Sequence, residues 1–345
     1  MSKSKPGVLI VTWNFPPRTG GIENLLAGLR RGLQKDRRVL VLAAQAAGGG
    51  NEEWLLRPKR PGLAAFFLFA FCRGLAALWK NPDLEIILGG SALVAPLVLA
   101  LAKLSGRKSA VLVHGLDLLY PRRIYQTLFV RWLKHCDRIV ANSGYTSSLA
   151  GRRGVRKEAI AVIPPGVEAG SIPPGRAEDL KAELGLGGRK VLLSVGRLAR
   201  RKGLKEFLQN SFPAVAAALP EAVFLIVGGN PAESLVHRED VRGELEGLVE
   251  RMRLEDRVRF LGPIDDAALA RVYRAADLMV LPALSLKDDV EGFGMVVIEA
   301  ALAGVPAVAT RSGGIPDAIE DGKSGVLVPP GDYPALTGAI VRMLR

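Results

Sequence analysis

The chain has 345 residues, 49% hydrophobic and 23% charged, a composition that excludes a disordered chain and predicts an ordered protein of about two domains. Its two cysteines, Cys72 and Cys136, lie far apart, and its three histidines show no metal-ligand spacing, which argues against a disulfide framework or a zinc site and favours the cytoplasm. The net charge of +13 favours phosphate-bearing small molecules or anionic lipid headgroups over nucleic acid as partners, because the basic residues are scattered with little aromatic stacking material between them.

Short apolar runs alternate with helical patterns in the first half of the chain. The runs predict strands at 8–12, 38–43, 84–88, 110–114, 138–142 and 160–164. Helices are predicted at Ile22–Leu33, Leu63–Trp79, Ala92–Leu104 and Arg122–His135. Continuous apolar strands that alternate with helices are typical of a parallel sheet covered on both faces.

A glycine pair, Gly20 and Gly21, follows the first predicted strand and precedes the helix that begins near Ile22. Glycine lets a ligand approach the backbone, and N–H groups at the start of a helix attract phosphate. The spacing is not GxGxxG, so the dinucleotide fingerprint is absent. An ordinary strand–helix turn explains the segment equally well.

The segment Leu63–Trp79 approaches the length of a membrane span, but Arg73 interrupts it and basic residues flank it. We expect a helix partly buried on its own domain, with one face available to a bilayer surface. A wholly buried core helix is the alternative.

His114 ends the fourth predicted strand and is followed by Gly115. At that place it is expected to point toward a ligand, where its ring could contact a sugar hydroxyl or a backbone carbonyl. A hydrogen-bonded structural histidine is the alternative.

The second half of the chain repeats the alternation of strands and helices. Strands are predicted at 190–195, 223–228, 258–262, 278–282, 307–310 and 325–329. A Pro- and Gly-rich segment at 166–188 is interpreted as a hinge between an N-terminal domain, 1–165, and a C-terminal domain, 189–345. Because ligands of such sheets bind beyond the carboxyl ends of the strands, the site is expected in a cleft between the domains.

Basic residues follow the first strand of the second half. Arg197 and Lys202 lie five residues apart in a loop before a helix, and a fork of guanidinium nitrogens with an ammonium suits a diphosphate. Arg200 and Arg201 are interpreted as solvated members of the same run, and a charged surface loop is the alternative for the run as a whole.

Two carboxylates bracket a glycine-rich loop near the C-terminus. Glu291 lies in the loop, and Glu299 lies in the second turn of a predicted helix, Met295–Ala303. The free N–H groups at the start of that helix would attract an anion. The alternative is that Glu299 is a solvated helix residue and Glu291 a first-turn charge favoured by the helix dipole. Asp288 and Asp289, just before the loop, are interpreted as a solvated turn.

The chain resembles glycosyltransferase family 4 in six segments that occur in the family's order: FPPRTGGIE, HGLD, VIPPGV, SVGRLARRKG, VRFLGPIDDAALARVYRAADLMVLPA and EGFGMVVIEAALAGVPAVAT. The form DVEGFG looks most similar to bacterial phosphatidylinositol mannosyltransferases and their lipid- or polysaccharide-modifying relatives. The resemblance implies the GT-B fold, in which two doubly wound Rossmann-like α/β domains face each other across a cleft. It also implies a retaining enzyme that takes a hexose from a GDP- or UDP-sugar to a lipid or glycan acceptor.

The resemblance assigns roles to the residues described above. Arg197 and Lys202 would hold the donor diphosphate, Glu299 would accept hydrogen bonds from the ribose, and Glu291 would hold hydroxyls of the donor sugar. Further contacts are implied for Gly20 and Gly21 with the phosphates and acceptor, for His114 with the sugar near its anomeric carbon, for the backbone of Phe293, Gly294 and Met295 with the sugar, and for Gly262 and Pro263 with the base.

The family's favoured mechanism is front-face attack, in which the leaving diphosphate accepts the acceptor's proton. Catalysis is then electrostatic, with Arg197, Lys202 and the helix N-terminus at Gly294 stabilising the charge on the leaving group. His114 and Glu291 complete the expected catalytic residues through their contacts with the sugar, and neither a metal nor another cofactor is expected. The expected location is the cytoplasm, on or near the inner face of the membrane. Family members usually continue for one or two more helices that return to the N-terminal domain, whereas this sequence ends one helix after Pro330. Domain closure is therefore an open point of the resemblance.

Two alternatives share the same donor residues. A sugar-nucleotide epimerase of this fold would act on the donor without an acceptor, and an inactive nucleotide-sugar-binding protein would bind the donor without turnover.

Overall fold

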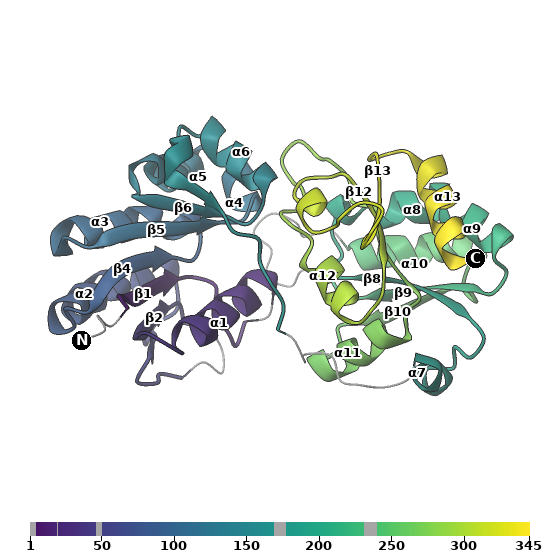
Figure 1. Ribbon diagram of the computed structural model, residues 1–345, viewed down its shortest axis with the longest axis horizontal. Helices are drawn as coiled ribbons and strands as arrows, with labels where there is room; N and C mark the ends of the chain where they lie inside the picture. The colour runs from purple at the N-terminus through teal and green to yellow at the C-terminus, as the bar shows by residue number, and fades with distance from the viewer. Residues whose placement is uncertain (1–4, 19, 46–49, 169–176, 231–239) are drawn as a thin grey trace. The chain divides into compact units, whose positions relative to one another are not determined.

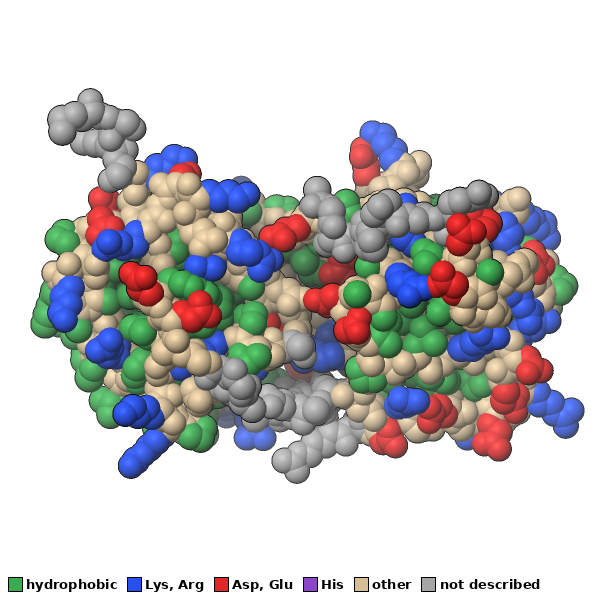
Figure 2. Space-filling view, turned by 90° about the horizontal axis from the view of Figure 1, so that it is seen from below, with side chains coloured by type: hydrophobic (Ala, Val, Ile, Leu, Met, Phe, Trp, Pro, Cys, Tyr) green, Lys and Arg blue, Asp and Glu red, His purple; other side chains and the backbone are tan. Residues whose placement is uncertain are grey.

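Both halves of the chain fold into a parallel sheet flanked by helices (Figure 1). The computed structural model describes residues 5–18, 20–45, 50–168, 177–230 and 240–345. It divides into two units, Met1–Pro165 and Gly166–Arg345. On the face that Figure 2 shows, Lys and Arg side chains are spread over both units, as their scatter in the sequence predicts.

The N-terminal sheet has seven strands in the order β3-β2-β1-β4-β5-β6-β7, all parallel. They are β1 (Gly7–Thr12), β2 (Val39–Ala43), β3 (Leu55–Leu56), β4 (Leu84–Gly89), β5 (Lys108–Val113), β6 (Arg138–Ala141) and β7 (Ile160–Val162). Six of them were predicted, whereas the two residues of β3 are too few to produce a pattern. The order reverses beside β1, as in doubly wound sheets.

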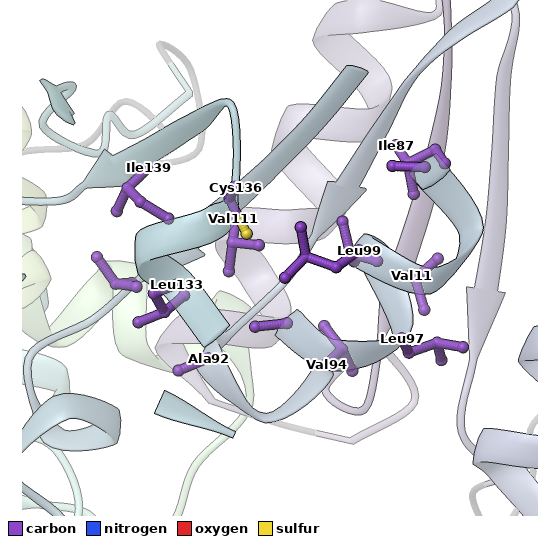
Figure 3. Packing of buried hydrophobic residues seen from close by; sticks show 14 of the residues in the cluster. Val11, Ile87, Ala92, Val94, Leu97, Leu99, Val111, Leu133, Cys136 and Ile139 are labelled. Carbon is purple, nitrogen blue, oxygen red and sulfur yellow. The ribbon is translucent and has the colours of Figure 1, made fainter. Parts of the chain in front are cut away.

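Helices cover both faces of this sheet. They are α1 (Gly21–Leu33), α2 (Leu63–Lys80), η1 (Ala92–Val94), α3 (Ala95–Ser105), α4 (Leu116–Leu119), α5 (Arg123–Leu128), η2 (Val130–His135), α6 (Gly144–Arg152) and η3 (Lys157–Ala159). Because side chains alternate along a strand, Leu9 and Val11 face the core beneath α2 and α3, whereas Val8 and Ile10 face the core beneath α1. Figure 3 shows part of the first core.

Two predicted helices differ in detail from the structure. The helix expected at Arg122–His135 is α5 followed by the 3₁₀ helix η2, because Phe129 leaves the helical conformation with φ −123° and ψ −58°. Its ring packs against Phe67 of α2 and Tyr125 of α5. The tertiary contact therefore decides where this helix breaks. The helix expected at Ala92–Leu104 begins with the 3₁₀ turn η1 and continues as α3.

The C-terminal sheet has six parallel strands in the order β10-β9-β8-β11-β12-β13. They are β8 (Lys190–Val195), β9 (Ala222–Val227), β10 (Val258–Gly262), β11 (Leu278–Leu281), β12 (Ala307–Thr310) and β13 (Gly325–Val328), all predicted. The order reverses between β8 and β11. In open sheets, ligands bind outside the carboxyl ends of the strands at such a reversal.

Helices and 3₁₀ turns also cover both faces of the second sheet. They are α7 (Ala177–Glu183), η4 (Arg200–Lys202), α8 (Leu204–Asn210), α9 (Phe212–Ala218), α10 (Val241–Arg251), α11 (Asp266–Ala275), α12 (Met295–Leu302), η5 (Ile315–Asp317) and α13 (Tyr333–Leu344). Helix α7 lies inside the segment interpreted as a hinge, yet Lys181 on it pairs with Asp277 at 2.7 Å. That part of the segment therefore packs with the C-terminal unit, while residues 169–176 lie outside the described part.

Candidate active site

The loops that follow β8 and β11 meet at the strand-order reversal of the C-terminal sheet. We call residues 196–203 the β8 loop and residues 282–294 the β11 loop. The backbone N–H of Leu284 donates to the carbonyl of Arg201 at 2.7 Å. At Gly203 the backbone has φ +68°, and a Cβ atom would lie 2.0 Å from the carbonyl oxygen of Pro282, so this close approach requires glycine.

The two loops share a buried cluster of four charged side chains. Lys202 Nζ lies 2.9 Å from Glu291 Oε2, and the Arg201 guanidinium lies 3.5 Å from both Glu291 and Asp289. The side chains of Lys202 and Glu291 are only 8% and 14% exposed. A buried cluster of two cations and two carboxylates holds the loops together, because removing one partner would leave an uncompensated buried charge.

The pKa values in this cluster follow from its pairing. Burial by itself would raise the pKa of Glu291, but the charges of Lys202 and Arg201 outweigh burial and hold that pKa below its usual value. Burial would lower the pKa of Arg201, but Glu291 and Asp289 raise it instead. Glu291 is therefore held as a carboxylate between two cations.

Acid should weaken this cluster. Because the pKa of Glu291 is lower in the folded protein than its usual 4.5, its contribution to the free energy of unfolding is fully present above the usual value and lost as pH falls through the folded value. We expect Glu291→Gln to show a shallower loss of stability than the wild type as pH falls below the usual value of 4.5. Chemical denaturation across that pH range measures it, and parallel curves for the two proteins would contradict the pairing.

Two predictions about charged residues of these loops were wrong. Arg201 of the β8 loop and Asp289 of the β11 loop were interpreted as solvated, but their side chains are only 12% and 7% exposed and face each other. Position in a run of charges does not reveal burial, because the partners come from segments 88 residues apart. Arg197 is exposed and lies outside the cluster, and Arg200 is exposed as expected.

Glu299 lies in the second turn of α12, and its Oε2 accepts a hydrogen bond of 2.7 Å from the hydroxyl of Tyr273. Burial raises the pKa of Glu299, and Asp266 adds to the effect, whereas the Tyr273 hydrogen bond and Lys202 partly offset it. Because Lys202 lowers the pKa of both Glu291 and Glu299, its ammonium is electrostatically coupled to both carboxylates. Lys202 and Glu291 are in contact, and all three side chains lie on segments that follow β8 or β11 at the carboxyl edge of the sheet.

Tyr273 was missed by the sequence analysis. It is 2% exposed and lies on α11, within the segment VYRAADLMV that carries part of the family resemblance. In the sequence, a tyrosine on the apolar face of a helix looks like any other core residue. A buried tyrosine hydroxyl needs a hydrogen-bond partner, and this requirement could have indicated a polar residue nearby.

Three glycines lie at the carboxyl ends of neighbouring strands, on the same sheet edge as Lys202. Gly196, Gly228 and Gly262 follow or end β8, β9 and β10, and the N–H of Gly228 donates to the carbonyl of Gly262 at 2.9 Å. A Cβ atom at Gly228, where φ is +125°, would lie 2.0 Å from the carbonyl oxygen of Gly196. Pro263 packs beside Gly229 on the same edge. The residues expected near the base thus lie on the same sheet edge as Lys202.

The β11 loop delivers Glu291 and opens α12. Gly294 precedes the helix with φ +89°, and the helix begins at Met295 as predicted. Phe293 is buried and anchors the loop. The carbonyl of Glu291 accepts from the N–H of Gly314 at 2.9 Å, so the backbone of Glu291 is also held from the strand β12 side.

His114 in the N-terminal unit is a buried, hydrogen-bonded residue. Its Nε2 lies 2.9 Å from the carbonyl oxygen of Gly90, and its backbone N–H donates to Asp117. Because a carbonyl only accepts, Nε2 carries the proton, and Nδ1 is the nitrogen left for another contact. The structure therefore gives His114 the bonding of the structural alternative, and its contact with a sugar stays a prediction.

The glycine pair begins α1 as predicted. Gly20 is the N-cap and Gly21 the first helical residue. Glu23, which was not predicted as a site residue, is buried in the first turn and accepts from the side-chain amide of Asn14 at 2.7 Å. A side chain at Gly20 would collide with the Glu23 carboxylate, since a Cβ atom would lie 2.5 Å from its Oε2.

Across the part of the chain that the structure describes, no group of three or more His, Cys, Asp or Glu residues could hold a metal ion.

Two family models together match most of the chain. Residues 19–170 match the model described as Glycosyltransferase Family 4, and residues 189–345 match the model described as Glycosyl transferases group 1. The boundary between the two matches falls in the Pro- and Gly-rich segment.

Individual proteins show the same similarity. A GDP-mannose-dependent alpha-(1-6)-phosphatidylinositol monomannoside mannosyltransferase from Mycolicibacterium smegmatis is 29% identical over 98% of this chain and 89% of its own length. A D-inositol 3-phosphate glycosyltransferase from Actinosynnema mirum is 36% identical over 56% of this chain, and the match spans 45% of that relative. The structure of HepE from Anabaena in complex with UDP superimposes with a TM-score of 0.74 at 21% identity, covering 97% of this chain and 89% of HepE.

Proposed function

Because the chain belongs to glycosyltransferase family 4 and has the GT-B fold, we propose that it is a retaining transferase that moves a hexose from a GDP- or UDP-sugar to a lipid or glycan acceptor. The observation that carries the proposal is Lys202, paired with Glu291 at 2.9 Å and electrostatically coupled to Glu299, at the strand-order reversal of the C-terminal sheet. One cation between two carboxylates suits a diphosphate flanked by a sugar and a ribose.

The local geometry supports a division of labour between the two carboxylates. The hydroxyl of Tyr273 occupies one oxygen of Glu299, which leaves the other oxygen to accept from ribose hydroxyls. Glu291 is anchored through its carbonyl and its cations, so it can present an oxygen to a sugar hydroxyl. We place the base beside Gly262 and Pro263, which lie on the same sheet edge as Lys202.

The low pKa of Glu291 argues against its acting as a general base, because an efficient base titrates near the working pH. We therefore propose front-face attack. The bond from the anomeric carbon to the diphosphate breaks as the bond to the acceptor oxygen forms on the same face, and the acceptor's proton passes to the departing diphosphate. Lys202, Arg197 and the N–H groups that begin α12 would stabilise the charge on the leaving group, so the step needs no metal ion.

The relatives support the substrate class without deciding the base. The Mycolicibacterium smegmatis relative is GDP-mannose-dependent, whereas HepE structures contain UDP and UDP-glucose. The proposed acceptor, a lipid or glycan, rests on the same relative, whose name gives a phosphatidylinositol monomannoside as its acceptor. Phosphate contacts of Gly20 and Gly21 and a sugar contact of His114 remain part of the proposal.

Binding of the nucleotide tests the donor site directly. We expect either UDP or GDP, but not both equally, to raise the melting temperature of the wild type, since a ligand at ten times its Kd adds about 1.4 kcal/mol to the free energy of unfolding. Lys202→Ala and Glu299→Ala should lose that shift. The matched control is Lys205→Ala, because Lys205 is exposed and pairs with Glu244 outside the site. If UDP, GDP and ADP all leave the melting temperature unchanged, the donor-site assignment is wrong.

A further inference from the structure

We propose that the outward faces of α2, α3, α5 and η2 form one docking surface for an anionic lipid bilayer. The proposal concerns the N-terminal unit alone and goes beyond the transfer reaction, although it rests on the proposed lipid acceptor for its purpose. It rests structurally on exposed apolar side chains, on the continuity of the four elements and on their charge.

Large hydrophobic side chains are exposed on all four elements. On α2, Leu68 and Trp79 are each 69% exposed, and on α5 Ile124 is 72% exposed. Leu104 on α3 and Trp132 on η2 are exposed as well. Contiguous exposed apolar surface marks an interaction site, whereas single exposed residues are ordinary.

The four elements are contiguous. Helix α2 packs against α3, and both α3 and α5 pack against η2. The ring of Phe67 on α2 lies 6.0 Å from that of Phe129, the residue between α5 and η2. These contacts join the four elements, which extend from Leu63 to His135 in the sequence, into one layer.

Helix α2 is two-sided, and both sides are apolar. Its inner stripe, Phe66, Ala70, Gly74 and Leu78, is buried at a spacing of four residues. Leu68 and Trp79 lie near the opposite side of a helix with 3.6 residues per turn. The wholly buried alternative for this helix is therefore wrong, and its outer stripe is apolar where a solvated helix would be polar.

Helix α2 also has the length and hydropathy of a membrane span, but only 22% of it is buried in the protein. Its inner stripe belongs to the core that contains β1, and the ring of Phe66 contacts Trp13 at 5.5 Å. Withdrawing the helix into a bilayer would expose that core. The packing therefore favours a helix that lies on the bilayer surface over one that crosses it.

The charge of the surface selects an anionic occupant. The four elements contain no aspartate or glutamate, and six basic residues on them are exposed: Arg73, Lys80, Lys103, Arg123, Arg131 and Lys134. None of the six makes an ion pair with another described residue. A second copy of the chain would bring like charges together, whereas anionic headgroups complement them and apolar side chains enter between the headgroups.

Vesicle co-sedimentation of the whole chain tests the proposal. We expect binding to phosphatidylcholine vesicles that contain phosphatidylglycerol, and at least about tenfold weaker binding to phosphatidylcholine alone. Leu68→Ser with Trp79→Ser should weaken binding to the anionic vesicles about tenfold or more, and Arg73→Glu with Lys80→Glu should do the same. The matched charge control is Arg251→Glu with Arg342→Glu, two exposed residues of the C-terminal unit, which should bind like the wild type.

The outcomes separate this proposal from its rivals. A wild type that stays in the supernatant with anionic vesicles at low salt overturns it, and so does equal loss in the control and surface variants. Self-association at high protein concentration that Leu68→Ser with Trp79→Ser abolishes, without vesicle binding, would mean a second copy occupies the surface. The melting-temperature shift with UDP or GDP, measured on the same variants, reports folding and the donor site independently of vesicle binding.

Discussion

Replacing Lys202 with methionine is expected to remove most transfer activity and to destabilise the C-terminal unit at the same time. The ammonium is the cation that we place at the leaving diphosphate, and loss of one such electrostatic partner costs about 10²–10³-fold in kcat. In the folded protein it also neutralises Glu291, whose side chain is 14% exposed. Leaving that carboxylate with Arg201 alone should lower the free energy of unfolding by about 3 kcal/mol.

A second substitution separates the two effects. In Lys202→Met with Glu291→Gln, the neutral amide no longer needs the ammonium, so stability should recover while turnover stays low. Steady-state kinetics and chemical denaturation of the single and double variants measure this, with Lys205→Met as the surface control. Recovery of activity together with stability would show that Lys202 acts through folding alone.

Replacing Glu299 with glutamine is expected to stabilise the protein while weakening the donor. Burial raises the pKa of Glu299 above its usual value, so the folded protein binds more protons than the unfolded chain as pH rises past that value. The ionised carboxylate therefore costs stability at neutral pH. Glutamine removes the charge and still accepts the hydrogen bond from Tyr273.

Donor affinity should move the other way. A ribose hydroxyl that loses a charged acceptor should bind about tenfold to a hundredfold more weakly. The gain in stability should shrink toward acid pH, where the wild-type carboxyl is protonated too. Denaturation at several pH values, and titration with whichever of UDP and GDP raises the melting temperature of the wild type, measure both effects, with Glu250→Gln as an exposed control. A variant that is less stable than the wild type at neutral pH contradicts the burial argument.

Much of the site was predictable because its residues follow strands. The strands β8 and β11 are continuous apolar runs, and parallel strands end at the same edge of a sheet. Lys202 and Glu291 could therefore be placed on one edge from the sequence, and the structure brings them into contact. Gly262 and Pro263 belong to that edge for the same reason.

The rest of the site depends on burial, which a charge pattern does not show. Arg201 and Lys202 are adjacent in a run of basic residues, yet Arg201 turns to Asp289 while Arg197 stays exposed. Tyr273 lies on the apolar side of α11, where the sequence indicates only core. Its hydroxyl meets Glu299 because α11 and α12 pack on the same core beside β8 and β11.

The sequence by itself determined that this protein has two parallel sheets, where their strands lie and which loops carry charge, because apolar runs, helical patterns and the charges between them are local properties of the chain. Only the tertiary structure decided which charges are buried together and which face of α2 is exposed. Burial depends on contacts between residues far apart in the sequence and on the removal of water when they pack. No single segment of the sequence contains that information.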